Sequence, residues 1–389
     1  MSRNRIGVWD SELVTSDSQQ TSTDRSTLLS KCLKKKKLLC IIIVIIIVIL
    51  VVTIPTVIIK TKTANVMNLS TESTEITNMI VPLTVAIETT NQQFTTTTRV
   101  PSKPKYNEWK QHGITIAGGN GYGNQSNQLL NPDGIYIDDN KAILIADRAN
   151  HRIVEWKYNA KEGQMIAGRN KEGNSLVQLN LPADVIVDRE KNAIVICDYG
   201  NERVMRWYRQ SQKNPQILIS NINCISVAID KDGSVYVSDW TKSEVRRWKE
   251  GDTVGTLVAG GNGPGDSLNQ FSRPIKIFVD IDYSVYISDW LNHRVMKWRK
   301  DAKEGIIVAG GNGKGHNLNQ LYEPDSSNFR VMKWREGDKN GSIVVGGYGS
   351  GEGSNQLGNP RDLSFDVEGN LYVSDFTNHR IQKYEQCTE

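Results

Sequence analysis

The sequence is poor in the residues that most often carry catalysis and bind metals. Its 389 residues include only five histidines and five cysteines. An odd number of cysteines argues against a framework of disulfides. The charges nearly cancel, because 47 Lys and Arg residues stand against 43 Asp and Glu residues. A nucleic-acid-binding domain needs a basic surface, so we expect no nucleic-acid partner.

One segment is long and apolar enough to cross a membrane. Residues 38–59 carry no charge, and a helix of that length spans a hydrocarbon core of roughly 30 Å. The segment follows a long polar stretch and lacks a small-residue cleavage site, which predicts a retained signal anchor. Five lysines lie just before it and two just after it. This asymmetry predicts a cytosolic N-terminus and an extracellular C-terminal part at the plasma membrane.

The residues around the anchor differ in composition from the rest of the chain. Residues 1–37 are polar and nearly free of aromatics, which predicts a disordered cytosolic tail. Residues 60–105 are rich in threonine and suit an extended stalk. Sequons for N-glycosylation begin at Asn68, Asn124 and Asn340, as in an ectodomain made on the secretory route.

The remaining residues, 106–389, repeat a pattern with a fixed internal spacing. In each copy an aspartate is followed nine residues later by a large aromatic. The aspartates are Asp147, Asp198, Asp239, Asp289, Asp325 and Asp375, and the aromatics are Trp156, Trp207, Trp248, Trp298, Trp334 and Tyr384. Segments such as IKIFV, SVYIS and RVMKW are rich in β-branched and aromatic residues, and turn residues separate them. In the unit that ends at Trp298 we expect strands at 255–260, 275–280, 284–288 and 293–298.

Four short strands in each repeat of this length predict an all-β fold and a propeller blade. The pattern P-x-x-I/L-x-x-D, then L/V-Y-V-S-D, then N-H-R-V resembles the NHL repeat family. The resemblance covers residues 106–389 and implies a six-bladed propeller. Gly113–Gly118 precedes the first blade and the last copy lacks an outer strand, so we expect the N-terminal strand to close the ring.

The fifth copy is short. Residues 269–298 of the fourth copy correspond to residues 319–334, so 14 residues are missing between Pro324 and Asp325. These would form the two inner strands. Either this is a truncated blade or the sequence comes from a gene model that skips a piece. The second is favoured, because losing the inner strands would leave a hole beside the channel.

The turn between two strands that recurs in the copies, here called the repeated corner, offers the clearest candidate residues. In each of five copies an aspartate at the end of one strand is followed five residues later by an arginine at the beginning of the next. A charge-assisted bridge between the two across the turn would set the strand register. The pairs are Asp147 and Arg152, Asp198 and Arg203, Asp289 and Arg294, Asp325 and Arg330, and Asp375 and Arg380. We interpret them as structural. Cys197 and Cys224 should lie near one face, as a disulfide or as two buried thiols.

No catalytic, cofactor-binding or metal-binding residue emerges from the sequence. Lyases that resemble this fold bind metal through histidines lining the channel, and no expected inner strand here contains a histidine. The sequence therefore favours a membrane-anchored extracellular module that binds a protein, a glycan or a small ligand. The alternative is a metal-dependent ectoenzyme of the lyase or lactonase type. Some NHL relatives bind RNA, which suggests RNA binding as a third role. The predicted topology disfavours it, because it places the propeller outside the cell.

Overall fold

The computed structural model describes residues 85–88 and 108–387, except for residues 170, 210–212 and 325–326. All of them belong to one compact unit, Ile76–Glu389. The expected tail, the anchor at 38–59, Asn68 and all of the expected stalk at 60–105 except residues 85–88 lie outside the described residues. Within the described part, no helix is long and apolar enough to cross a bilayer.

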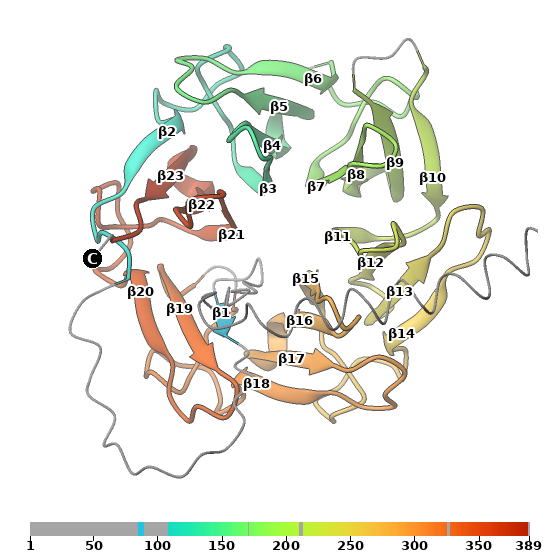
Figure 1. The fold of residues 1–389 in the computed structure, drawn as a ribbon, viewed down its shortest axis with the longest axis vertical. Helices are drawn as coiled ribbons and strands as arrows, with labels where there is room; N and C mark the ends of the chain where they lie inside the picture. The colour runs from blue at the N-terminus through green and yellow to red at the C-terminus, as the bar shows by residue number, and fades with distance from the viewer. Residues whose placement is uncertain (1–84, 89–107, 170, 210–212, 325–326, 388–389) are drawn as a thin grey trace, which may run out of the picture. The chain divides into compact units, whose positions relative to one another are not determined.

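The described residues form an all-β propeller with five four-stranded sheets, or blades, arranged around a channel (Figure 1). The first two blades in the sequence consist of β3 (Pro132–Ile137), β4 (Ile143–Asp147), β5 (Arg152–Trp156) and β6 (Gln164–Gly168), and of β7 (Pro182–Asp188), β8 (Ala193–Asp198), β9 (Arg203–Tyr208) and β10 (Gln216–Ser220). The next two consist of β11 (Cys224–Ile229), β12 (Val235–Asp239), β13 (Glu244–Trp248) and β14 (Thr256–Gly260), and of β15 (Pro274–Val279), β16 (Val285–Asp289), β17 (Arg294–Trp298) and β18 (Ile306–Gly310). The last blade consists of β21 (Pro360–Phe365), β22 (Leu371–Asp375), β23 (Arg380–Tyr384) and β2 (Ile114–Gly118).

Neighbouring strands of each blade pair antiparallel, in sequence order in four blades and with β2 as the outer strand of the last one. The strand named first in each blade lies innermost (Figure 1). The strands expected in the unit that ends at Trp298 match β14, β15, β16 and β17 within a residue or two. The first of them, β14, belongs to the preceding blade, because it pairs with β13. Each sequence repeat therefore spans the outer strand of one blade and three strands of the next.

The ring closes as expected. β2 pairs antiparallel with β23, with Ile114 opposite Lys383 and Gly118 opposite Arg380. The last blade thus takes its outer strand from the N-terminal end of the domain. An isolated bridge between Trp109 and Gln386 extends this closure.

The short fifth copy forms a three-stranded sheet instead of a four-stranded blade. Its strands are β1 (Val85–Glu88), β19 (Arg330–Arg335) and β20 (Ser342–Gly346), in the order β1-β19-β20. β19 and β20 correspond to the third and fourth strands of a complete blade and pair antiparallel. The edge that would receive the missing second strand pairs instead with β1, which runs parallel to β19.

The hydrophobic core lies between neighbouring sheets, since each sheet buries both faces. Met332 and Trp334 of β19 pack against Tyr286 and Val295 of the preceding blade. Val331, on the opposite face, packs with the following blade. The incomplete sheet is therefore held in the ring on both sides by apolar contact.

Candidate functional site

The repeated corner is a buried ion pair in the four copies where both residues are described. The arginine Nε donates to the aspartate Oδ2 over 2.7 Å in Asp147–Arg152, Asp198–Arg203 and Asp289–Arg294, and over 2.8 Å in Asp375–Arg380. The two residues of each pair lie opposite each other in the ladder of the second and third strands. Burial raises the pKa of Asp147, Asp198 and Asp289 despite the arginines.

The same corner also holds the loop from the preceding blade. Arg152 donates to the carbonyl oxygens of Asn124, Gln125 and Gln128, and Asp147 accepts the backbone amide of Leu130. One charged pair thereby fixes the loop of residues 119–131, which joins β2 to β3. The geometry is that of a structural clamp.

The corner histidines link blades rather than acting as reactive groups. His151, His293 and His379 occupy left-handed conformations with φ of 55°, 53° and 54°. Each accepts, through Nδ1, a backbone amide of the next repeat over 3.1–3.2 Å. Burial lowers the pKa of His293 and His379, which favours the neutral form that accepts these amide hydrogens.

The fifth corner differs. Asp325 lies outside the described residues. Arg330 donates to the carbonyls of His316 and Asn317 at 2.8 and 3.1 Å, but its Nε is buried with no hydrogen-bond partner among the described residues. Burial lowers the pKa of this arginine. The clamp on the loop is kept, and the described structure shows no carboxylate on Nε.

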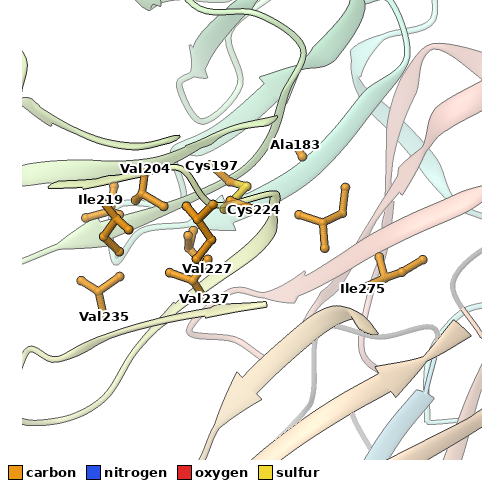
Figure 2. Packing of buried hydrophobic residues seen from close by; sticks show 12 residues of the cluster. Ala183, Cys197, Val204, Ile219, Cys224, Val227, Val235, Val237 and Ile275 are labelled. Atoms are coloured by element: carbon orange, nitrogen blue, oxygen red, sulfur yellow. A yellow bond between two sulfur atoms is a disulfide. The ribbon is translucent and has the colours of Figure 1, made fainter. Parts of the chain in front are cut away.

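Cys197 and Cys224 form a disulfide, with Cα atoms 5.6 Å apart. The bond joins the second strand of one blade to the first strand of the next, inside an apolar cluster that includes Ala183, Val227 and Ile275 (Figure 2). Asn124 and Asn340 are exposed, so both sequons are accessible to a glycosyltransferase.

A ring of polar residues that the sequence analysis missed surrounds the channel. The third residue of each innermost strand occupies an equivalent position, and neighbouring innermost strands are in contact. These residues are Gly134, Asp184, Ser226, Lys276 and Asp362. Ser226, Lys276, Asp184 and Asp362 are all nearly inaccessible to solvent.

Ring side chains accept backbone amides from the next blade. Asp362 accepts the amide of Ile135 at 2.9 Å, and Asp184 accepts that of Val227 at 3.1 Å and the hydroxyl of Ser226 at 2.6 Å. Ser226 in turn accepts the amide of Ile277. These hydrogen bonds therefore link neighbouring blades around the channel.

Gly134 breaks this pattern for a steric reason. A Cβ atom at position 134 would collide with the Asp184 carboxylate and with the backbone of that strand. Asp184 uses the freed space and also accepts the amide of its own neighbour, Val185. A larger residue at 134 would push this carboxylate out of the ring.

The ammonium group of Lys276 lies among three carboxylates beside the channel. It lies 3.3 Å from Asp362, 3.5 Å from Asp184 and 3.9 Å from Asp133. Asp133 is also paired with Arg148 at 2.6 Å. Burial alone would lower the pKa of Lys276, but the three carboxylates outweigh it and raise that pKa. The lysine is therefore held in its charged form.

The carboxylates do not share one electrostatic environment. Burial raises the pKa of Asp362 to about 7, and the neighbouring Asp184 adds to the effect against the attraction of Lys276. Burial also raises the pKa of Asp184. For Asp133, Lys276, Arg148 and Arg361 outweigh burial and lower the pKa. Near neutral pH the carboxyl of Asp362 is therefore close to its pKa and can take up or release a proton.

A cavity of about 520 Å³ adjoins this ring. Asp184 and Asp362 lie among its lining residues, while most of the wall is apolar, including Val227, Ile277 and Phe278. Ligand sites are typically apolar clefts of this size with a few polar groups. The channel can therefore receive a small molecule or a side chain of a partner.

Arginine–aromatic pairs lie near the beginning of the innermost strands. Arg148 stacks on Tyr199, Arg273 on Trp240 and Arg361 on Phe376, with ring distances of 4.6–4.9 Å. Each aromatic directly follows the last residue of a second strand. Aromatic and arginine side chains are enriched at protein interfaces, so these pairs are candidates for contact with a protein partner.

A metal ion does not fit the ring as the structure has it. Among the described residues of the ring, the carboxylates gather at one place, and the Lys276 ammonium already lies between them. No group of three His, Cys, Asp or Glu residues in the described part of the chain is arranged to hold a metal. We therefore derive no metal-dependent step.

Comparison with known proteins supports the repeat and the fold. The NHL repeat model matches residues 357–384. These residues form the corner and the strands β21 to β23 of the last blade. The chain is thus a β-propeller that contains an NHL repeat. The search of curated sequences gave no match.

Several solved structures share the fold at low sequence identity. A Bacteroides thetaiotaomicron protein of unknown function has a TM-score of 0.57 and 17% identity, over 72% of this chain and 76% of that one. An auxiliary nutrient binding protein from the same organism has a TM-score of 0.56 and 15% identity, over 72% and 77%. A putative phosphatase from that organism has a TM-score of 0.51 and 15% identity, over 72% and 80%. At such identities the likeness concerns the fold alone.

Proposed function

We propose that the protein is a membrane-anchored extracellular propeller that binds a ligand in its channel. The observation that carries this proposal is the 520 Å³ cavity, whose apolar wall ends at the carboxylates Asp184 and Asp362. Lys276 neutralises part of their charge from within the ring. A built-in counter-charge suits a site that binds without a metal ion.

The proposal includes the expected anchor and six blades. Residues 38–59 hold the chain in the bilayer, residues 1–37 are cytosolic, and residues 60–105 connect the anchor to the propeller outside and contribute Val85–Glu88 to it. The sheet β1-β19-β20 is the sixth blade in shortened form. Support comes from the lysine asymmetry around 38–59 and from the packing of β19 between two complete blades.

Ligand capture by the full chain in lipid nanodiscs tests the binding role. A small-molecule library is screened for compounds that raise the Tm. The variant Ser364→Trp serves as the matched comparison, because Ser364 lines the cavity and is only half-buried, so a tryptophan there can fill the cavity without entering the core between the blades. We expect ligands that stabilise the wild-type chain to have no effect on the variant. Equal stabilisation of both would place binding outside the channel.

The topology has its own test. In intact cells, a tag placed after Glu389 should be cleaved by added protease, while a tag before Met1 should be protected. The reverse pattern would contradict the extracellular location.

The alternative function is a metal-dependent ectoenzyme of the lyase or lactonase type. The convergence of Asp133, Asp184 and Asp362 from three innermost strands favours it, and the position of Lys276 among them opposes it. Adding zinc or calcium to the full chain distinguishes the two. A rise in Tm that Asp184→Asn abolishes would support the enzyme.

A further inference from the structure

We propose that the inner edge of β19 is an acceptor site for an extended peptide strand, and that this chain fills it with its own segment Val85–Glu88. In complete blades the third strand pairs on one side with the second strand and on the other with the fourth. β19 keeps the fourth-strand equivalent, β20, and lacks the second. Its inner edge is thus left with backbone groups to satisfy.

The segment 85–88 occupies the place of the missing strand (Figure 1). Val85 pairs with Met332, Ala86 with Lys333, Ile87 with Trp334 and Glu88 with Arg335. The pairing is parallel, whereas the second and third strands of complete blades pair antiparallel. A strand of opposite direction from outside the repeat is typical of β-strand addition, in which an exposed edge accepts an extended peptide.

The path of the chain brings this segment close to its acceptor. Glu108 is bound to Lys333 of β19, with both carboxylate oxygens within 3.0 Å of Nζ. Trp109 packs in the same cluster as Val331. The propeller domain therefore begins beside β19. A segment tethered a few tens of residues before that point acts at an effective concentration of roughly millimolar, which is enough for a short strand to compete with free peptides.

The composition of the segment suits this role. Val and Ile have high β propensity, and the stretch V-A-I-E contains neither Gly nor Pro. The acceptor strand is also well held from its other edge, since Val331, Met332 and Trp334 are buried against the neighbouring blades. The edge is thus rigid before the segment arrives, and little ordering is needed on the acceptor side.

Amide hydrogen exchange in the full chain in nanodiscs tests the proposal. The variant Ala86→Pro removes a backbone donor and restricts φ at the centre of the segment. We expect the amides of β19 that face the segment to exchange at least about tenfold faster in this variant, while those bonded to β20 stay protected, because local protection reports pairing. The matched control is Thr95→Pro, which adds a proline nearby in sequence without touching the segment. It should leave β19 unchanged.

A synthetic peptide of residues 83–90, added at millimolar concentration to the Ala86→Pro chain, should restore protection of β19. The same peptide with proline at position 86 should not. The proposal is overturned if β19 exchanges equally in wild type and Ala86→Pro, or if the peptide has no effect. Protection that depends on protein concentration would assign the strand to a second copy and also overturn it.

Exchange in β7 and β8 monitors the rest of the ring, and should be unchanged by Ala86→Pro. If the proline loosens the whole ring, Ala86→Gly gives a milder test, since glycine weakens a strand without removing its amide. This site lies apart from the channel cavity, so failure here leaves the ligand-binding proposal intact.

Discussion

The strands β17 and β19 have the same five residues, Arg-Val-Met-Lys-Trp, in different surroundings. In β17 the arginine pairs with Asp289 at the end of the preceding strand. In β19 the arginine keeps its bonds to the loop carbonyls, and its Nε has no partner among the described residues. Both strands form, and both are buried. The strand therefore forms without the antiparallel second strand of a complete blade, while the ion pair of the corner needs an inner strand that ends in aspartate.

The largest effect should come from breaking the complete corner. Asp289→Ala leaves the guanidinium of Arg294 buried without its carboxylate and frees the amide of Ser272. We expect a loss of about 3–5 kcal/mol in the free energy of unfolding. In the incomplete sheet, Arg330→Met should cost only about 1–2 kcal/mol, since it removes hydrogen bonds to two carbonyls. Urea unfolding measures both. Equal losses would show that the two corners do not differ in energy.

The ring around the channel shows the same contrast, because complete blades contribute Gly134, Asp184, Ser226, Lys276 and Asp362 to it, whereas the incomplete sheet contributes none among the described residues. The pKa of Asp362 rises from 3.8 to about 7 on folding. The folded state thus holds a proton that the unfolded chain releases between these values, so stability should fall as the pH rises from 4 to 7.

The variant Asp362→Asn removes this titration and can still accept the amide of Ile135. Because one pKa unit corresponds to 1.36 kcal/mol, the wild type should lose on the order of 2–4 kcal/mol across this range relative to the variant. Because the charge of Asp184 raises the pKa of Asp362, the difference between the two proteins reports the titration of this pair of carboxyls rather than of Asp362 alone. Urea unfolding at pH 4.5, 6 and 7.5 gives the comparison. Parallel pH profiles would contradict the assignment.

Restoring the missing strands should turn β19 into a copy of β17. Residues 275–288 lie between Pro274 and Asp289, and a copy of them fits between Pro324 and Asp325. The insertion supplies an inner pair and should displace the segment 85–88 from β19. A gain of about 2 kcal/mol would raise the Tm by roughly 4–8 °C. A Gly/Ser insertion of equal length is the control and should give no rise. A lower Tm with the copied residues would show that the incomplete sheet is the native form.

Much of the fold could be predicted from the sequence, because the period of the repeat fixes it. The spacing from each aspartate to its aromatic predicted the second and third strands, and the surplus strand Gly113–Gly118 predicted the closure that β2 and β23 confirm. The pairing of residues 85–88 with β19 could not be predicted. Three apolar residues followed by a glutamate in a threonine-rich segment carry no signal, and their partner depends on an edge that only the folded ring exposes.

The candidate site was missed for a related reason. The repeat pattern P-x-x-I/L-x-x-D marks residues that most blades share, and the channel position falls on its second variable position. Asp184, Ser226, Lys276 and Asp362 therefore look unremarkable in a search for shared residues. Comparing the copies at that one position would have found them, since a buried lysine in an inner strand requires a partner. Their convergence across blades needs the closed ring.

The smallest expected effect concerns the lysines of the two matching strands. Lys333 bonds both oxygens of Glu108 at 2.9 and 3.0 Å, while Lys297 lies 3.5 Å from one oxygen of Glu336. Both glutamates are partly exposed, so each pair should contribute less than about 1 kcal/mol. Double-mutant cycles with alanine should give a larger coupling for Lys333–Glu108, and it should weaken in high salt. If the two coupling energies are equal, the ion pair between Glu108 and Lys333 is an ordinary surface pair. A larger coupling energy for Lys333–Glu108 means that the beginning of the domain is fixed beside β19, where the preceding segment can reach the inner edge of that strand.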